Sequence, residues 1–140
     1  MALDNCGARW RLLLADDHEP ILAVVKELLR AQYDIVGTAT DGASLLDLAA
    51  KLGPDVVVSD ISMPRLNGVQ AAQRIKDSGT KTKLVFLTVY SESEFIRSAF
   101  AVGALGYVLK RRLMTDLPLA IEAALQGKRF VSPSLRVPTE

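Results

Sequence analysis

Three aspartates stand at the ends of two apolar segments of this chain. Asp16 and Asp17 directly follow the run at residues 10–15, and Asp60 follows the valine-rich run at residues 56–59. If both runs are neighbouring parallel strands, their carboxyl ends bring three carboxylates to one edge of a sheet, where mutual repulsion demands a cation or protons. Carboxylate oxygens are the ligands that Mg²⁺ and Mn²⁺ prefer, so the residues point to a metal site.

Two further polar side chains occupy equivalent positions. Thr88 lies near the end of the apolar run at residues 83–89, and Lys110 directly follows the run at residues 105–109. A carboxylate can attack phosphorus to give an aspartyl phosphate, while a hydroxyl and an ammonium group can bind the phosphoryl oxygens. The same edge of the predicted sheet therefore carries the groups that phosphoryl transfer to an aspartate needs.

The elements that must position these residues alternate regularly. Strands are expected at residues 10–15, 33–39, 55–59, 83–89 and 105–109, each followed by an amphipathic helix. A capping box at Ser91 and Glu94 should open the fourth helix, and Thr115 or Asp116 should cap the fifth. Short connections between alternating strands and helices favour an α/β fold, a parallel sheet covered by helices on both faces.

Composition narrows the class of protein. The chain has 140 residues, of which 49% are hydrophobic, and a net charge of +1, so we expect one compact domain without the basic surface that nucleic acid binding needs. The single cysteine, Cys6, excludes an internal disulfide and favours a reducing compartment. No segment reads as a signal peptide or membrane span. We expect a cytoplasmic protein that binds neither nucleic acid nor membrane.

Taken together, the motifs resemble the receiver domains of bacterial two-component response regulators. They are Asp-Asp at 16–17, Asp-Ile-Ser-Met-Pro at 60–64, Asn-Gly at 67–68, Thr88, and Tyr-Val-Leu-Lys at 107–110. The resemblance covers about residues 9–127 and implies a flavodoxin-like (βα)5 doubly wound sheet with strand order 2-1-3-4-5. Gly-Ala-Leu-Gly-Tyr at 103–107 and Gly-Lys-Arg-Phe-Val-Ser-Pro at 127–133 are similar to receivers that precede a LuxR-type helix-turn-helix output domain.

The resemblance implies a phosphorylation site with a bound metal. Asp60 is the expected phosphoacceptor. The expected ligands of Mg²⁺, for which Mn²⁺ could substitute, are Asp16, Asp17, Asp60 and the backbone carbonyl of Ser62.

The resemblance also implies a conformational switch and its partners. Thr88 and Lys110 match the positions that bind the phosphoryl group, and Tyr107 matches an aromatic side chain that turns inward when Thr88 moves. The implied phosphate donor is a sensor histidine kinase, and a homodimer formed on phosphorylation is a further expected partner. The output of such a switch in a full-length protein would be transcription.

Two other functions, an enzyme with an aspartyl-phosphate intermediate and a module that only binds partners, fit the sequence less well. A phosphatase or phosphomutase of the haloacid dehalogenase type has an aspartate two residues after its nucleophile, where this chain has Ser62. We therefore expect a signalling switch and not an enzyme. A receiver-like module that only binds partners is disfavoured by the full set of acidic, threonine and lysine positions, and helix capping explains single aspartates but not all three.

Domain boundaries follow from the same patterns. We expect a tail at residues 1–8, the receiver at 9–127, and an irregular linker or tail at 128–140 with the output domain absent. The alternative is a natural single-domain switch that acts on a protein partner. Two positions depart from the family pattern: Arg111 follows Lys110 in place of proline, so a trans peptide is expected, and Val89 replaces a smaller residue beside Thr88.

Overall fold

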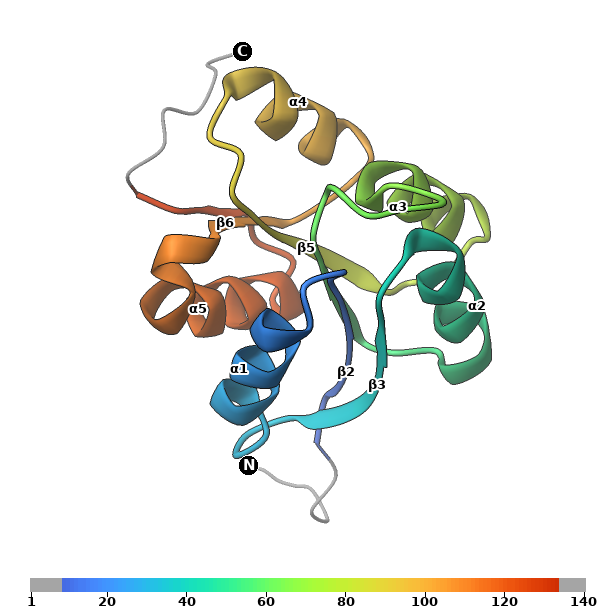
Figure 1. Cartoon of the computed structure of the whole chain (residues 1–140), viewed down its shortest axis with the longest axis horizontal. Helices are drawn as coiled ribbons and strands as arrows, with labels where there is room; N and C mark the ends of the chain where they lie inside the picture. Colours follow the sequence, from blue (N-terminus) through green and yellow to red (C-terminus); the bar gives the residue numbers. More distant parts are fainter. Residues whose placement is uncertain (1–8, 134–140) are drawn as a thin grey trace.

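Six short runs of the chain pair side by side in one parallel sheet (Figure 1). The computed structural model describes residues 9–133. The strands are β2 (Arg11–Ala15), β3 (Asp34–Ala39), β4 (Val56–Ser59), β5 (Lys83–Thr88), β6 (Gly106–Leu109) and β7 (Phe130–Val131). Their order in the sheet is β3-β2-β4-β5-β6-β7. Counted along the chain this is 2-1-3-4-5-6, which confirms the predicted flavodoxin-like order and adds a sixth strand.

Five helices cover the two faces of the sheet. They are α1 (Glu19–Leu29), α2 (Gly42–Leu52), α3 (Gly68–Asp77), α4 (Ser93–Ala101) and α5 (Leu113–Leu125), and a short 3-10 turn (Lys110–Arg112) precedes α5. One buried cluster joins the sheet to α1 and α5, and a second joins it to α2, α3 and α4. None of the helices within residues 9–133 is long and apolar enough to cross a bilayer.

Successive side chains of the central strands point to opposite faces of the sheet, so each strand contributes to both buried clusters. Leu13 of β2 packs toward α2, α3 and α4, whereas Leu12 and Leu14 pack toward α1 and α5. All four residues of β4 are buried, as the run of three valines predicted. Apolar side chains on both faces therefore fix the strands that carry the candidate site residues.

The predicted helix caps were partly wrong. The N-cap of α4 is Glu92 and makes no side-chain cap bond, so the capping box at Ser91 and Glu94 does not form. Neither Thr115 nor Asp116 caps α5, because the 3-10 turn moves the start of that helix back to Leu113.

Two caps are formed by side chains of the preceding loops. Asp41, the N-cap residue of α2, accepts a hydrogen bond from the Ser44 amide at 2.7 Å. Asn67 and Gln70 form a reciprocal capping box at α3, which the sequence analysis did not identify.

The C-terminal segment is more ordered than predicted. Residues after 127 were expected to be irregular, but Phe130 and Val131 of β7 pair with Gly106 and Tyr107 of β6. A two-residue strand is too short to show a period, which is why the pattern gave no sign of it. The predicted tail at residues 1–8 and the end of the predicted linker, residues 134–140, lie outside the described residues.

The loop after β4 is held by close backbone approaches at two glycines. The Gly68 amide donates to the Ile61 carbonyl at 2.7 Å, and a Cβ at position 68 would lie 2.0 Å from the Asp60 carbonyl oxygen. A Cβ at Gly42 would lie 1.8 Å from the Leu66 carbonyl oxygen. Both helix N-termini can therefore press against this loop only because these residues lack side chains.

Gly68→Ala tests the close approach at α3. The added methyl group must push against backbone, so the free energy of unfolding should fall by about 1–3 kcal/mol. Gly79→Ala is the control, because its Cβ would meet nothing within 4 Å and only its positive φ of 84° opposes the change, at about 1 kcal/mol. Urea unfolding monitored by circular dichroism measures both variants. A loss at position 68 no larger than at position 79 would contradict the packing described here.

Candidate functional site

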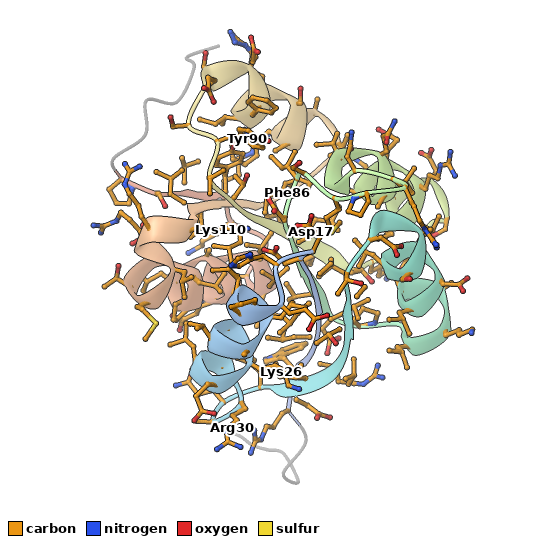
Figure 2. The ribbon with its side chains drawn as sticks, in the orientation of Figure 1. Asp17, Lys26, Arg30, Phe86, Tyr90 and Lys110 are labelled. Carbon is orange, nitrogen blue, oxygen red and sulfur yellow. The ribbon has the colours of Figure 1, made fainter. Side chains whose placement is uncertain are left out.

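The site residues converge at the carboxyl ends of four neighbouring strands. Asp16 and Asp17 follow β2, Asp60 follows β4, Thr88 ends β5, and Lys110 follows β6. Lys110 contacts Asp16 and Asp60, and Asp17 lies beside these two acids; Asp17 and Lys110 are labelled in Figure 2. This is the position at which open parallel sheets bind ligands.

Lys110 forms ion pairs with two of the three carboxylates. Its Nζ lies 2.7 Å from Asp16 Oδ2 and 3.0 Å from Asp60 Oδ2. Burial by itself would lower the pKa of Lys110, but the contacts with Asp16 and Asp60 outweigh this effect and hold its pKa above the ordinary value. The ammonium group is therefore charged at neutral pH and offsets part of the repulsion in the cluster.

Asp16 is the most buried of the three acids, with 2% of its surface exposed. Desolvation by burial raises the pKa of Asp16, against the opposing effects of Lys110 and of the His18 amide, which donates to Oδ1 at 2.8 Å. Its Oδ2 lies 2.7 Å from the Lys110 ammonium nitrogen. Burial and the neighbouring Asp60 carboxylate both oppose the charge of Asp16, so a further cation would stabilise the ionised form.

Asp60 is held at both oxygens. The Ile61 amide donates to Oδ1 at 2.7 Å, and Lys110 donates to Oδ2 at 3.0 Å. Only 6% of the Asp60 surface is exposed. These two hydrogen bonds fix the orientation of the buried Asp60 carboxylate.

The acidic cluster fits a divalent ion with a preference for hard oxygen ligands. One carboxylate oxygen from each of Asp16, Asp17 and Asp60 lies within 4.8 Å of the others. Two oxygens bound to one Mg²⁺ at about 2.1 Å can be at most about 4.2 Å apart, so small side-chain movements would bring all three into range. Ser62 is exposed in the loop two residues after Asp60, and the role of its carbonyl stays a prediction.

Thr88 and Tyr107 are both fully buried and are linked through Tyr90. The Thr88 hydroxyl accepts a hydrogen bond from the Tyr90 amide at 3.4 Å, and the Tyr107 hydroxyl donates to the Tyr90 carbonyl at 2.7 Å. The Tyr90 ring stacks on Phe95 of α4 with ring centroids 4.4 Å apart. Tyr107 therefore already points inward. A series of contacts also leads from Thr88 through Tyr90 to Phe95 of α4.

Burial, reinforced by the nearby acidic side chains of Glu92 and Asp60, raises the pKa of Tyr107. Its phenol remains a hydrogen-bond donor at neutral pH. The sequence analysis missed Tyr90, whose only signal was an aromatic residue two positions after Thr88. It found Tyr107 through the family motif alone.

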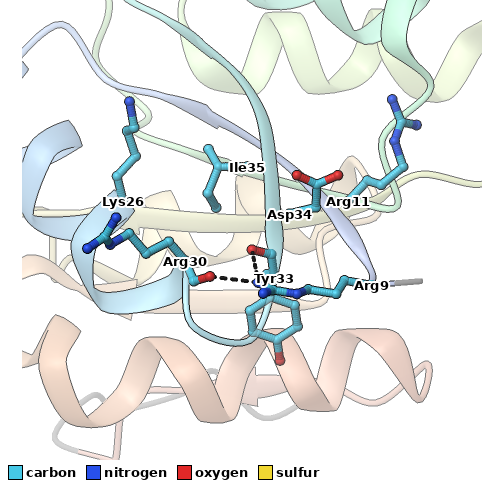
Figure 3. A pocket seen from close by; sticks show the side chains of 7 residues that line it. All are labelled: Arg9, Arg11, Lys26, Arg30, Tyr33, Asp34 and Ile35. Carbon is cyan, nitrogen blue, oxygen red and sulfur yellow. Dashed lines mark hydrogen bonds between the residues drawn. The ribbon is translucent and has the colours of Figure 1, made fainter. Parts of the chain in front are cut away.

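A hollow of about 630 Å³ lies at the opposite, amino-terminal edge of the sheet (Figure 3). Its lining is mainly basic and consists of Arg9, Arg11, Lys26, Arg30, Tyr33, Asp34 and Ile35.

Two arginines of this hollow, Arg9 and Arg11, bind carbonyl groups. Arg9 Nη1 donates to the Arg30 carbonyl at 2.7 Å and to the Tyr33 carbonyl at 3.2 Å, as Figure 3 shows. Arg11 Nη1 donates to the Leu52 carbonyl at 2.6 Å at the end of α2. The Arg30 and Leu52 carbonyls lie at helix ends, where backbone carbonyls lack a partner within the helix, and the arginines donate hydrogen bonds to them. These hydrogen bonds support a structural role for Arg9 and Arg11. The acidic cluster at the carboxyl edge of the sheet remains the candidate functional site.

A doubly wound parallel sheet with this set of residues at its carboxyl edge is the architecture of a receiver domain. The family model described as "Response regulator receiver domain" matches residues 12–122, and the chain belongs to this family. The predicted recognition is thereby confirmed.

Curated relatives are named as transcriptional regulators. The chain is 37% identical over 120 residues to the uncharacterized transcriptional regulatory protein YxjL of Bacillus subtilis, covering 84% of this chain and 55% of the relative. It is 33% identical over 126 residues to the transcriptional regulatory protein DesR of the same species, covering 89% and 62%. The chain thus spans little more than half of the length of these relatives.

Solved structures show the same fold. A LuxR-family two-component response regulator from Aurantimonas sp. SI85-9A1 has a TM-score of 0.86 at 32% identity, covering 91% of this chain and 93% of that one. The isolated receiver domain of RcsB from Salmonella enterica serovar Typhimurium, solved with the phosphomimetic BeF3-, has a TM-score of 0.83 at 27% identity, covering 91% and 96%. The similarity to the LuxR-type branch predicted from the sequence is confirmed.

Asp17→Asn tests the electrostatic account of the acidic cluster. In EDTA the variant should unfold about 2 °C above the parent, because the change relieves repulsion while the ion pairs of Lys110 with Asp16 and Asp60 remain. In Mg²⁺ the parent alone should gain stability, since the variant has lost a ligand. Thermal unfolding measures both conditions. Asp47→Asn, the same change on the exposed side of α2, is the control, and an apo variant no more stable than the parent would contradict the account.

Proposed function

We propose that this receiver domain accepts a phosphoryl group on Asp60 from a phosphohistidine of a sensor histidine kinase. The proposed ligands of the required Mg²⁺ are Asp16, Asp17, Asp60 and the Ser62 carbonyl. The observation that carries the proposal is the Asp60 carboxylate, which is buried, is held at both oxygens, and lies within 4.8 Å of two further acids. Family membership supports it.

The proposed transfer needs only groups that this edge supplies. One Asp60 oxygen forms the new bond to phosphorus while the phosphorus–nitrogen bond of the phosphohistidine breaks, and the imidazole keeps the electron pair and takes a proton from solvent. A bound Mg²⁺ supplies charge neutralisation for the transferred group. The Lys110 ammonium, already 3.0 Å from Asp60 Oδ2, would bind one phosphoryl oxygen, and the Thr88 hydroxyl another.

The proposed switch runs through Tyr90. A phosphoryl group on Asp60 would attract the Thr88 hydroxyl, which now accepts a 3.4 Å hydrogen bond from the Tyr90 amide. The Tyr90 carbonyl accepts a hydrogen bond from Tyr107, and the Tyr90 ring stacks on Phe95 of α4. A movement of Thr88 that displaces Tyr90 would therefore shift the start of α4. A two-state change of this kind needs a different affinity for the phosphoryl group in each state.

The altered surface would control an output in the cytoplasm. The names of the relatives support transcription as that output in a longer protein. A homodimer that forms on phosphorylation is a further part of the proposal. The alternative, a single-domain switch, would act on a protein partner through the same surface. In both versions the chain signals by binding and does not turn over a small-molecule substrate.

Phosphorylation by acetyl phosphate tests the central step. Incubation with acetyl phosphate and Mg²⁺ should add one phosphoryl group, detected by intact mass, because Asp60 is the proposed nucleophile. Asp60→Asn should remain unmodified, and EDTA should prevent the reaction in the parent. Asp47→Asn, which lies on α2 outside the cluster, should react like the parent. An unmodified parent, or a phosphoryl group on the Asp60 variant, would refute the proposal.

Val89→Ala tests control of the phosphorylated lifetime. Val89 follows Thr88 directly and is 66% exposed, so its branched side chain can screen the site from attacking water. We expect the alanine variant to lose its phosphoryl group several-fold faster, measured by intact mass after acetyl phosphate is removed. Val24→Ala, an exposed valine on α1, is the matched control. An unchanged half-life in Val89→Ala would contradict the screening role.

A further inference from the structure

The C-terminal strand β7 contacts the backbone next to the site lysine. Ser132, directly after β7, is fully buried, and its amide donates to the Tyr107 carbonyl at 3.0 Å. The Ser132 hydroxyl oxygen accepts from the Leu109 amide at 3.1 Å. Leu109 is the last residue of β6 and immediately precedes Lys110. The backbone before the lysine is thus fixed by a side chain from a remote segment.

The backbone after Lys110 is fixed by Asp116 of α5. Arg112 ends the 3-10 turn that Lys110 begins, and its Nε donates to Asp116 Oδ2 at 3.0 Å. Burial opposes the charge of Asp116, but hydrogen bonds from Arg112 and from the Ser132 side chain hold the pKa of Asp116 below its ordinary value. Ser132 therefore joins the two anchors, accepting from Leu109 and bonding to Asp116.

We propose that Ser132 and Asp116 are positioning residues for Lys110, which fix the backbone on both sides of the lysine so that its ammonium group stays on Asp60. The inference rests on the proposed function. A lysine side chain has a flexible four-carbon stem, so the position of its ammonium depends on how firmly its backbone is held. A displacement of about 1 Å at a reacting group can cost about 100-fold in rate, which makes such anchoring consequential.

The competing explanation is that Ser132 only secures the edge strand. Such a role would lower stability without changing the chemistry of the folded protein. The buried chain of bonds from Leu109 to Ser132 and Asp116 favours the positioning role, because it ends at the turn that carries Lys110. The three acids of the metal site follow β2 and β4 and are not members of this chain of bonds, so the two explanations differ in their effect on the phosphorylation rate of the folded protein.

Ser132→Ala removes the hydroxyl and leaves the backbone pairing of β7 in place. At saturating Mg²⁺ we expect the rate of phosphorylation by acetyl phosphate to fall about tenfold, while the Mg²⁺ dissociation constant from calorimetry should not rise, because the three acids stay in place. Ser132→Thr, which keeps the hydroxyl, should recover most of the rate. Ser78→Ala is the matched control, because it removes a hydroxyl that donates to the Ile75 carbonyl at 2.6 Å at the end of α3.

Asp116→Asn is the second variant, and it should show the same loss of rate. Because Ser132 and Asp116 act through one chain of bonds, the double variant should lose little more than the worse single variant. Amide hydrogen exchange in the parent provides a measurement that needs no variant, and the Leu109 amide should be protected.

Three results would overturn the positioning role. They are parent-like phosphorylation in folded Ser132→Ala or Asp116→Asn, strictly additive losses in the double variant, or rapid exchange of the Leu109 amide. Failure of the parent to be phosphorylated would instead refute the proposed function, so the two failures are distinguishable.

Discussion

The contact of one ammonium group with two buried carboxylates is the constraint on which this structure depends. Three acids at one sheet edge repel each other, and burial already raises the pKa of Asp16. Lys110 offsets part of this repulsion through its contacts with Asp16 and Asp60. The edge is therefore stable enough to form, and the repulsion that remains favours a further cation.

The fold brings these charges together through apolar packing remote from them. β2, β4, β5 and β6 are buried on both faces, so their carboxyl ends are held in fixed register and the polar residues that follow meet at one edge. The loop after Asp60 is confined in turn by Gly68 and Gly42, where helices press against its carbonyl groups. Packing thus supplies the force that holds like charges in proximity.

Most of this arrangement could be predicted from the sequence, and the exceptions have a common cause. Asp16, Asp60 and Lys110 each follow an apolar run, so the pattern places them at strand ends without any knowledge of contacts. The roles of Tyr90 and Ser132 depend on single hydrogen bonds between remote segments, which leave no period in the chain. The two-residue strand β7 was missed for the same reason.

Both ends of the proposed signal converge on β6. Tyr107 lies on this strand and binds Tyr90 in the segment that leads to α4, while Lys110 follows its last residue and binds Asp60. The strand is paired on one side with β5, which ends at Thr88, and on the other with β7. The residues that contact Asp60, Tyr90 and Ser132 are thus carried by one strand or directly follow it. Under the proposed function, β6 would connect a phosphoryl group on Asp60 to α4 and to the C-terminal segment.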